Sequence, residues 1–238
     1  MARWLKRPWA QLALVLAIAG LGNLLLYLYF VFFLHGPRNL FLVFNLVLAT
    51  IPLLLAWRLV VSLGHKRWSA WEPLLLTLLW LVFLPGSFFA VVDFTLLAAQ
   101  PSSSLLFAAV LFSGFIFESM LLGLASIYLV HVELKKRVKA HTAAALVTII
   151  LIGVSYAVYL GHDMNWNSWD IMLNPGGFIF DISNLLSKPH TYPTMVRTMA
   201  STFLYIGAAY LIVWRSARLI WHRGVNDLAA HIKRARHS

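Results

Sequence analysis

Two carboxylates lie in or beside apolar stretches that carry almost no other charge. Asp93 follows a proline, Pro85, and Glu118 lies near the middle of a long apolar run. Because polar groups are costly inside a bilayer, each is a candidate for binding, catalysis or proton handling. Asp93 is interpreted as a catalytic or ligand-binding carboxylate in an outward-facing cleft. The alternative is a structural charge that pairs with Arg38 or Arg197.

A compact polar cluster follows a later apolar run, at Asn167-Ser168-Trp169-Asp170. Asp170 is the second carboxylate of the catalytic hypothesis, and we expect it within one cavity's width of Asp93. The alternative is a capping box, in which Asn167 caps a short helix and Asp170 reaches back to its amides. The substrate-binding candidates are Asn167, Ser168, Trp169, Arg197, Arg38 and His162.

Glu118 is the proton-coupling candidate, because a buried carboxylate in a transporter can carry a proton across the membrane. The alternative is a structural hydrogen bond, for instance to Asn23 or Asn45. His131 lies near the end of the same apolar run and is interpreted as a contact with lipid head groups.

Metal and cofactor motifs are weak or missing in this sequence. The chain has no cysteine, which excludes disulfides and thiolate ligands. His162, Asp163 and His190 form a weak alternative for a metal site, because no histidine pair has helical ligand spacing. No glycine-rich phosphate loop is present, so we expect neither a resident metal nor a cofactor.

The composition places these groups in a membrane protein. Of the 238 residues, 61% are hydrophobic and 11% are charged, whereas soluble domains carry about 25% charged residues. The net charge of +11 comes from short basic runs that flank apolar stretches, a pattern typical of contact with anionic lipids and not of nucleic-acid binding. The expected partners are membrane lipids, with other membrane subunits as an open alternative.

Apolar runs of about 20 residues predict six transmembrane helices in a single all-α transmembrane domain covering residues 1–238. The first run is too long for a signal-peptide core and is interpreted as a retained helix. The third run would be about 43 Å long as one helix, so we expect it to bend or break at Pro85. The expected spans are residues 11–34, 40–63, 71–99, 105–132, 143–160 and 196–214.

Two further features concern packing outside and between the spans. Asn174-Pro175 predicts the start of a short amphipathic helix over residues 175–188, which we expect in the outer interface or over a cleft. Gly153, Ala157 and Gly161 recur every four residues. Such a stripe of small residues is typical of a close helix–helix contact.

The motifs resemble an uncharacterised bacterial integral membrane family, domain of unknown function 1361. Its second span is similar to Asn39-Leu40-Phe41-Leu42 and Ile51-Pro52-Leu53-Leu54-Leu55-Ala56. Its third is similar to the run from Leu79 to Pro85 followed by Asp93. Its most specific signature resembles Tyr159-Leu160-Gly161, Asn167-Ser168-Trp169-Asp170 and Asn174-Pro175. By these motifs the chain resembles a divergent member of the family, and the resemblance implies a topology and a polar cluster without an activity.

Three function classes remain open from the sequence. The first is an enzyme or binding protein that acts on a lipid or lipid-linked substrate at the outer leaflet, through an outward-facing polar cleft. The second is a structural or scaffold subunit of a larger complex. The third is a small-solute or proton-coupled transporter, for which no convincing inverted repeat is present.

The distribution of basic residues predicts the orientation in a bacterial inner membrane. With a cytoplasmic N-terminus, 16 of the 19 lysines and arginines lie inside, as the positive-inside rule requires. Reporter fusions after Lys139 and after Ser238 should therefore read cytoplasmic, and a fusion after Lys188 should read external. A periplasmic C-terminus would contradict the six-span topology.

Overall fold

The fold is a bundle of helices, seen in a computed structural model of the chain. The structure describes residues 8–35, 40–99, 105–163 and 193–235, and also residues 173, 174, 176, 177, 180, 183 and 187. These residues are almost all helical and contain no strand. Six helices are long and apolar enough to cross a membrane. The predicted all-α fold with six spans is confirmed, and the chain is a multi-pass membrane protein.

The helices follow the apolar runs in chain order. The first span is α1 (Pro8–Phe30), which ends in the π-helical turn η2 (Val31–His35), and the second is α2 (Phe41–Leu63). The third consists of α3 (Trp71–Phe83), α4 (Gly86–Phe89) and the 3-10 helix η3 (Ala90–Ala99). The last three are α5 (Leu105–Lys135), α6 (Ala140–Asp163) and α9 (Pro193–Ala235).

The third span is interrupted where Pro85 was expected to break it. α3 ends at Phe83, and α4 begins at Gly86 directly after the proline. Proline has no N–H to continue the α-helical ladder, and the backbone N–H groups of Phe88 and Phe89 instead bond the Pro85 carbonyl at 2.9 Å. The ten residues of η3 then form a 3-10 helix well beyond the usual length of about 3–4 residues.

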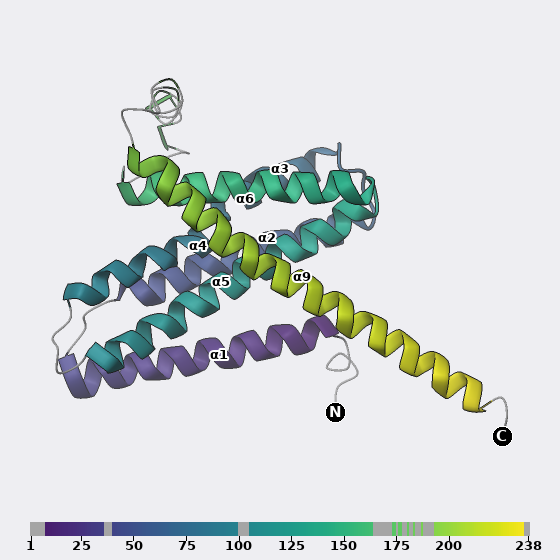
Figure 1. The fold of residues 1–238 in the computed structure, drawn as a ribbon, viewed down its shortest axis with the longest axis horizontal. Helices are drawn as coiled ribbons and strands as arrows, with labels where there is room; N and C mark the ends of the chain where they lie inside the picture. The colour runs from purple at the N-terminus through teal and green to yellow at the C-terminus, as the bar shows by residue number, and fades with distance from the viewer. Residues whose placement is uncertain are drawn as a thin grey trace.

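α5 is the central helix of the bundle, as Figure 1 shows. It contacts α1, α2, α4, η3, α6 and α9. In the most apolar part of each span, 50% of the residues of α5 are buried, whereas only 11% of the residues of α9 are buried. α9 lies obliquely across the bundle and extends past it (Figure 1). At about 1.5 Å per residue, its 43 residues are much longer than the membrane is thick.

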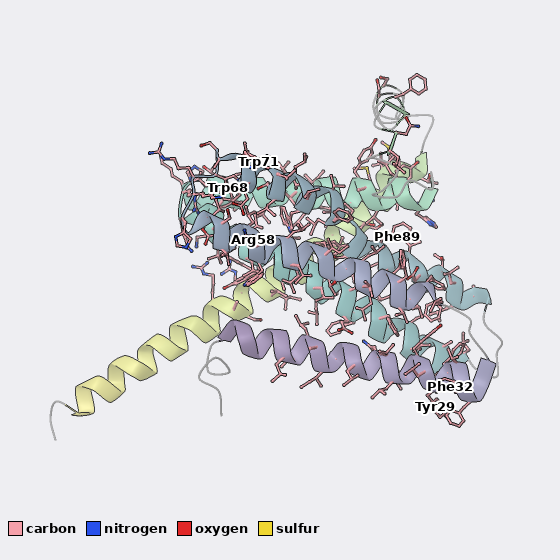
Figure 2. All side chains as sticks on the ribbon, turned by 180° about the vertical axis from the view of Figure 1, so that it is seen from behind. Tyr29, Phe32, Arg58, Trp68, Trp71 and Phe89 are labelled. Atoms are coloured by element: carbon pink, nitrogen blue, oxygen red, sulfur yellow. The ribbon has the colours of Figure 1, made fainter. Side chains whose placement is uncertain are left out.

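The connections α2–α3 and α5–α6 lie together at one end of the bundle. Arg137 in the second connection donates a hydrogen bond to the Leu63 carbonyl at 3.0 Å, and its guanidinium lies 5.6 Å from the centre of the Trp68 ring. Trp68 and Trp71 mark this end in Figure 2, with Tyr29 and Phe32 at the other. α1 begins and α9 ends toward the end marked by the tryptophans (Figure 1).

The predicted helix start at Asn174 is present in the structure. The Asn174 Oδ1 accepts a hydrogen bond from the backbone N–H of Gly177 at 3.0 Å, which is the N-cap arrangement. Most of the amphipathic segment over residues 175–188 lies outside the described residues, and its place over a cleft stays a prediction.

In the predicted stripe, Gly161 is buried and Ala157 is half-buried, but the close contact expected at Gly153 is wrong. Gly153 is exposed, and a Cβ there would meet no atom within 4 Å. The close approach lies instead at Gly123 of α5, where a Cβ would lie 2.7 Å from the Ser87 Cβ and 2.8 Å from the Phe88 ring. Helical spacing of small residues gives their common face but not what that face contacts, and at Gly153 it contacts no other helix.

Substitution of Gly123 and of Gly153 should therefore affect thermal stability differently. We expect Gly123→Ala to lower the midpoint of thermal unfolding by roughly 3–10 °C, because overpacking costs about 1–3 kcal/mol. The matched control Gly153→Ala should leave the midpoint unchanged or slightly raised, since alanine favours helix. Equal midpoints for both purified variants would contradict this packing.

Candidate functional site

Asp93 is buried and paired with an amide. Its side chain is 5% exposed, and its Oδ2 accepts a hydrogen bond from the Asn45 Nδ2 at 3.0 Å. η3 presents the carboxylate and α2 presents the amide, so the pair joins the second span to the third. Arg38 and Arg197 are the cations expected beside it. Arg38 lies outside the described residues, and Arg197 is exposed without an ion pair to any described residue.

Glu118 forms a second pair of the same kind. Its Oε2 accepts a hydrogen bond from the Asn23 Nδ2 at 2.7 Å, between α5 and α1. The hydrogen bond expected between Glu118 and Asn23 is thus present, and the proton-coupling role of Glu118 stays a prediction. Asn45, the other amide considered, bonds Asp93 instead.

Two glycines make room for the Asn23–Glu118 pair. A Cβ on Gly20 of α1 would lie 2.7 Å from the Glu118 Oε1, and a Cβ on Gly114 of α5 would overlap the Asn23 amide. Each helix therefore has a glycine opposite the polar side chain of the other. This arrangement lets α1 and α5 approach closely with the polar groups bonded to each other.

The outer polar cluster is mostly beyond what the structure describes. Asn167, Ser168, Trp169, Asp170 and His190 lie outside the described residues, as does the Asp163 side chain. Proximity of Asp93 to Asp170 therefore stays a prediction, as do the catalytic and substrate-binding roles. His162 is exposed near the end of α6. In the described part of the chain, no three histidines or carboxylates form a group that could hold a metal ion.

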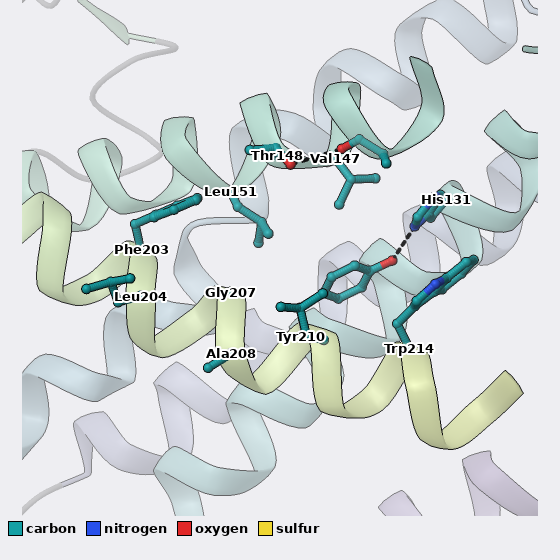
Figure 3. A pocket seen from close by; sticks show the side chains of 12 residues that line it. His131, Val147, Thr148, Leu151, Phe203, Leu204, Gly207, Ala208, Tyr210 and Trp214 are labelled. Atoms are coloured by element: carbon teal, nitrogen blue, oxygen red, sulfur yellow. Dashed lines mark hydrogen bonds between the residues drawn. The ribbon is translucent and has the colours of Figure 1, made fainter. Parts of the chain in front are cut away.

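An apolar groove lies between α6 and α9 and ends at α5. Its volume is about 350 Å³. Figure 3 shows α6 forming one wall and α9 the other, with His131 of α5 at one end. The groove is lined by His131, Ala144, Val147, Thr148, Leu151, Phe203, Leu204, Gly207, Ala208, Tyr210, Leu211 and Trp214.

The end of the groove at α5 is a stacked cluster of aromatic side chains. The His131 Nδ1 and the Tyr210 hydroxyl lie 2.6 Å apart in a hydrogen bond, drawn in Figure 3. The His131 ring also stacks on Trp214 with centroids 4.0 Å apart and planes inclined by 11°. His131 is 5% exposed, so its interpretation as a head-group contact is wrong.

A sequence signal for this groove existed in α9. Phe203, Gly207, Tyr210 and Trp214 recur at spacings of four, three and four, which places them on one helical face. A glycine between aromatic residues on that face leaves a hollow. The partner His131 was not recognisable, because the pairing of α5 with α9 is a tertiary contact.

The Asn23–Glu118 hydrogen bond should be measurable as a coupling between two substitutions. In a double-mutant cycle with Asn23→Ala and Glu118→Ala, we expect a coupling energy of about 0.5–2 kcal/mol for thermal or denaturant unfolding. Glu118→Gln should keep most of the stability, because its amide oxygen accepts the same bond. Additive single and double substitutions would mean that the two side chains do not interact.

Comparison with known proteins identifies the family. The family model described as "Protein of unknown function (DUF1361)" matches residues 44–206. The match covers α2 to the first part of α9 and leaves out α1. No curated protein and no solved structure matches the chain. The chain therefore belongs to the DUF1361 family of membrane proteins.

Proposed function

We propose that this protein binds a membrane lipid or a lipid-linked molecule, with its acyl chain in the groove between α6 and α9. The observation that supports the proposal is the groove itself. Its volume of about 350 Å³ falls in the usual range of about 300–1,000 Å³ for ligand pockets. Both walls belong to membrane spans, so an acyl chain can enter from the bilayer without passing through water.

The chemistry of the lining favours an acyl chain over a polar solute. Apart from Thr148 and the cluster at α5, the lining side chains are apolar or glycine. The hydrophobic effect does not drive a chain from lipid into such a groove, because lipid tails are as apolar as leucine. Packing against the groove walls therefore supplies the affinity, and polar groups at the end of the groove supply the selectivity.

The proposal includes the orientation in a bacterial inner membrane, with both termini in the cytoplasm. Its support is the 16 of 19 basic residues that a cytoplasmic N-terminus places inside. The two basic connections lie together at one end of the bundle, joined by the bond from Arg137 to the Leu63 carbonyl. On this orientation, the cluster of His131, Tyr210 and Trp214 belongs to the inner half of the membrane.

A second proposal keeps the outward-facing polar cleft, in which Asp93 and Asp170 process a lipid-linked substrate at the outer leaflet. The observation that favours it is the position of Asp93 on η3, a long 3-10 segment after a helix break. A 3-10 stretch within a span often marks a functional hinge or a strained sequence. The bond from Asn45 to Asp93 is equally what a structural pair requires, so we rank this proposal second.

Filling the groove should abolish lipid binding without unfolding the protein. A Cβ on Gly207 would meet no atom within 4 Å, so Gly207→Leu adds its side chain to open space in the groove. We expect this variant to lose most of the phospholipid that the wild type retains on native mass spectrometry after mild detergent exchange. Thermal unfolding should be nearly unchanged.

The matched control is Gly153→Leu on α6. Gly153 also has open space around it, but it does not line the groove. We expect wild-type lipid retention for this control. Equal retention by the wild type and by both variants would refute lipid binding in the groove.

A further inference from the structure

The stacking of His131 on Trp214 sets the register between α5 and α9. Consecutive spans cross a membrane in opposite senses, so the fourth and sixth spans run in the same direction. One helical turn beyond the stacked pair, toward the basic end of the bundle, α5 presents Lys135 and α9 presents Arg218. Both residues are exposed. The Lys135 Nζ lies 5.2 Å from the centre of the Trp214 ring, which keeps this cation beside the end of the groove.

Four of the other basic residues at the same end have carboxylate partners within the protein. Arg58 and Lys66 both pair with Glu72. Lys136 and Arg137 both pair with Glu133. Each carboxylate therefore offsets part of the charge of the two basic residues that it pairs with.

Lys135 and Arg218 differ from those residues. Within the described ranges, neither forms an ion pair with a carboxylate. Two unneutralised cations on adjacent helices, next to the end of an apolar groove, complement a molecule with an apolar chain and an anionic head.

We propose that Lys135 and Arg218 bind the phosphate of an anionic phospholipid whose acyl chain lies in the groove between α6 and α9. This inference rests on the proposed function and adds the lipid class and the leaflet. Lysine and arginine near an anionic leaflet bind its head groups electrostatically. On the proposed orientation the lipid belongs to the cytoplasmic leaflet. The acyl chain of the lipid lies along the groove past Tyr210, and the head group lies beyond Trp214.

Head-group selectivity is the test. The full-length protein is placed in nanodiscs with equal amounts of phosphatidylglycerol and phosphatidylcholine of the same acyl chains, and the retained lipids are quantified by native mass spectrometry. We expect the wild type to retain phosphatidylglycerol at least tenfold more than phosphatidylcholine. Lys135→Gln and Arg218→Gln should each reduce this ratio roughly fivefold.

The control removes the same charge elsewhere at the basic end. Lys139→Gln with Arg67→Gln should keep the wild-type ratio, because neither residue lines the groove or lies over the Trp214 ring as Lys135 does. If this control loses selectivity to the same extent as Lys135→Gln with Arg218→Gln, general surface charge is responsible and the site is refuted. Millimolar inorganic phosphate should not displace the lipid, whereas displacement would indicate a phosphate site independent of the acyl chain.

Two further variants separate the possible failures. If Gly207→Leu removes both lipids but Lys135→Gln with Arg218→Gln leaves the ratio unchanged, the groove binds lipid and only the head-group site is wrong. If Gly207→Leu retains lipid normally, the proposed function itself fails. Should the glutamine variants not fold, Lys135→Arg with Arg218→Lys keeps both charges. Preserved selectivity in that variant supports the site, and lost selectivity contradicts it.

Discussion

Polar groups inside a bilayer must find their partners within the protein, and this constraint shapes the bundle around α5. Water is not available to bond a buried carboxylate or an open carbonyl. Glu118 bonds Asn23, Asp93 bonds Asn45, and the Ser87 hydroxyl donates to the Ala49 carbonyl near Pro52. Each bond joins a different pair of helical segments. Helices that would otherwise be interchangeable apolar rods thereby acquire specific neighbours and a specific register.

The groove lies where these polar hydrogen bonds between helices become few. Among the described residues, the hydrogen bond seen between α9 and the rest of the bundle joins Tyr210 to His131. α9 otherwise packs on α6 by apolar contact, with small side chains at Gly207 and Ala208. A loosely packed helix beside a tightly bonded core leaves room for a ligand without weakening the core. The tightly bonded core specifies the fold, and the loosely packed α9 borders the groove that we propose binds lipid.

The number and type of the helices were predictable, because run length and composition are properties of each segment alone. The pairing of Glu118 with an asparagine was also predictable, since few polar partners exist in the spans. The contacts of Gly153 and the environment of His131 were not. Both depend on which face of one helix meets which face of another, and α5 and α6 have apolar residues on all sides. Periodicity cannot distinguish a lipid-facing stripe from a buried one in such helices.

The proposed entry of lipid from the bilayer determines which measure of concentration sets the occupancy of the groove. A ligand that never enters water reaches the groove by diffusion in two dimensions, and its occupancy depends on its mole fraction among the lipids. Dilution of cells or of vesicles therefore leaves the occupancy unchanged, whereas a shift in membrane composition alters it directly. With a lipid bound in this way, the occupancy of the protein would follow the lipid composition of its own membrane.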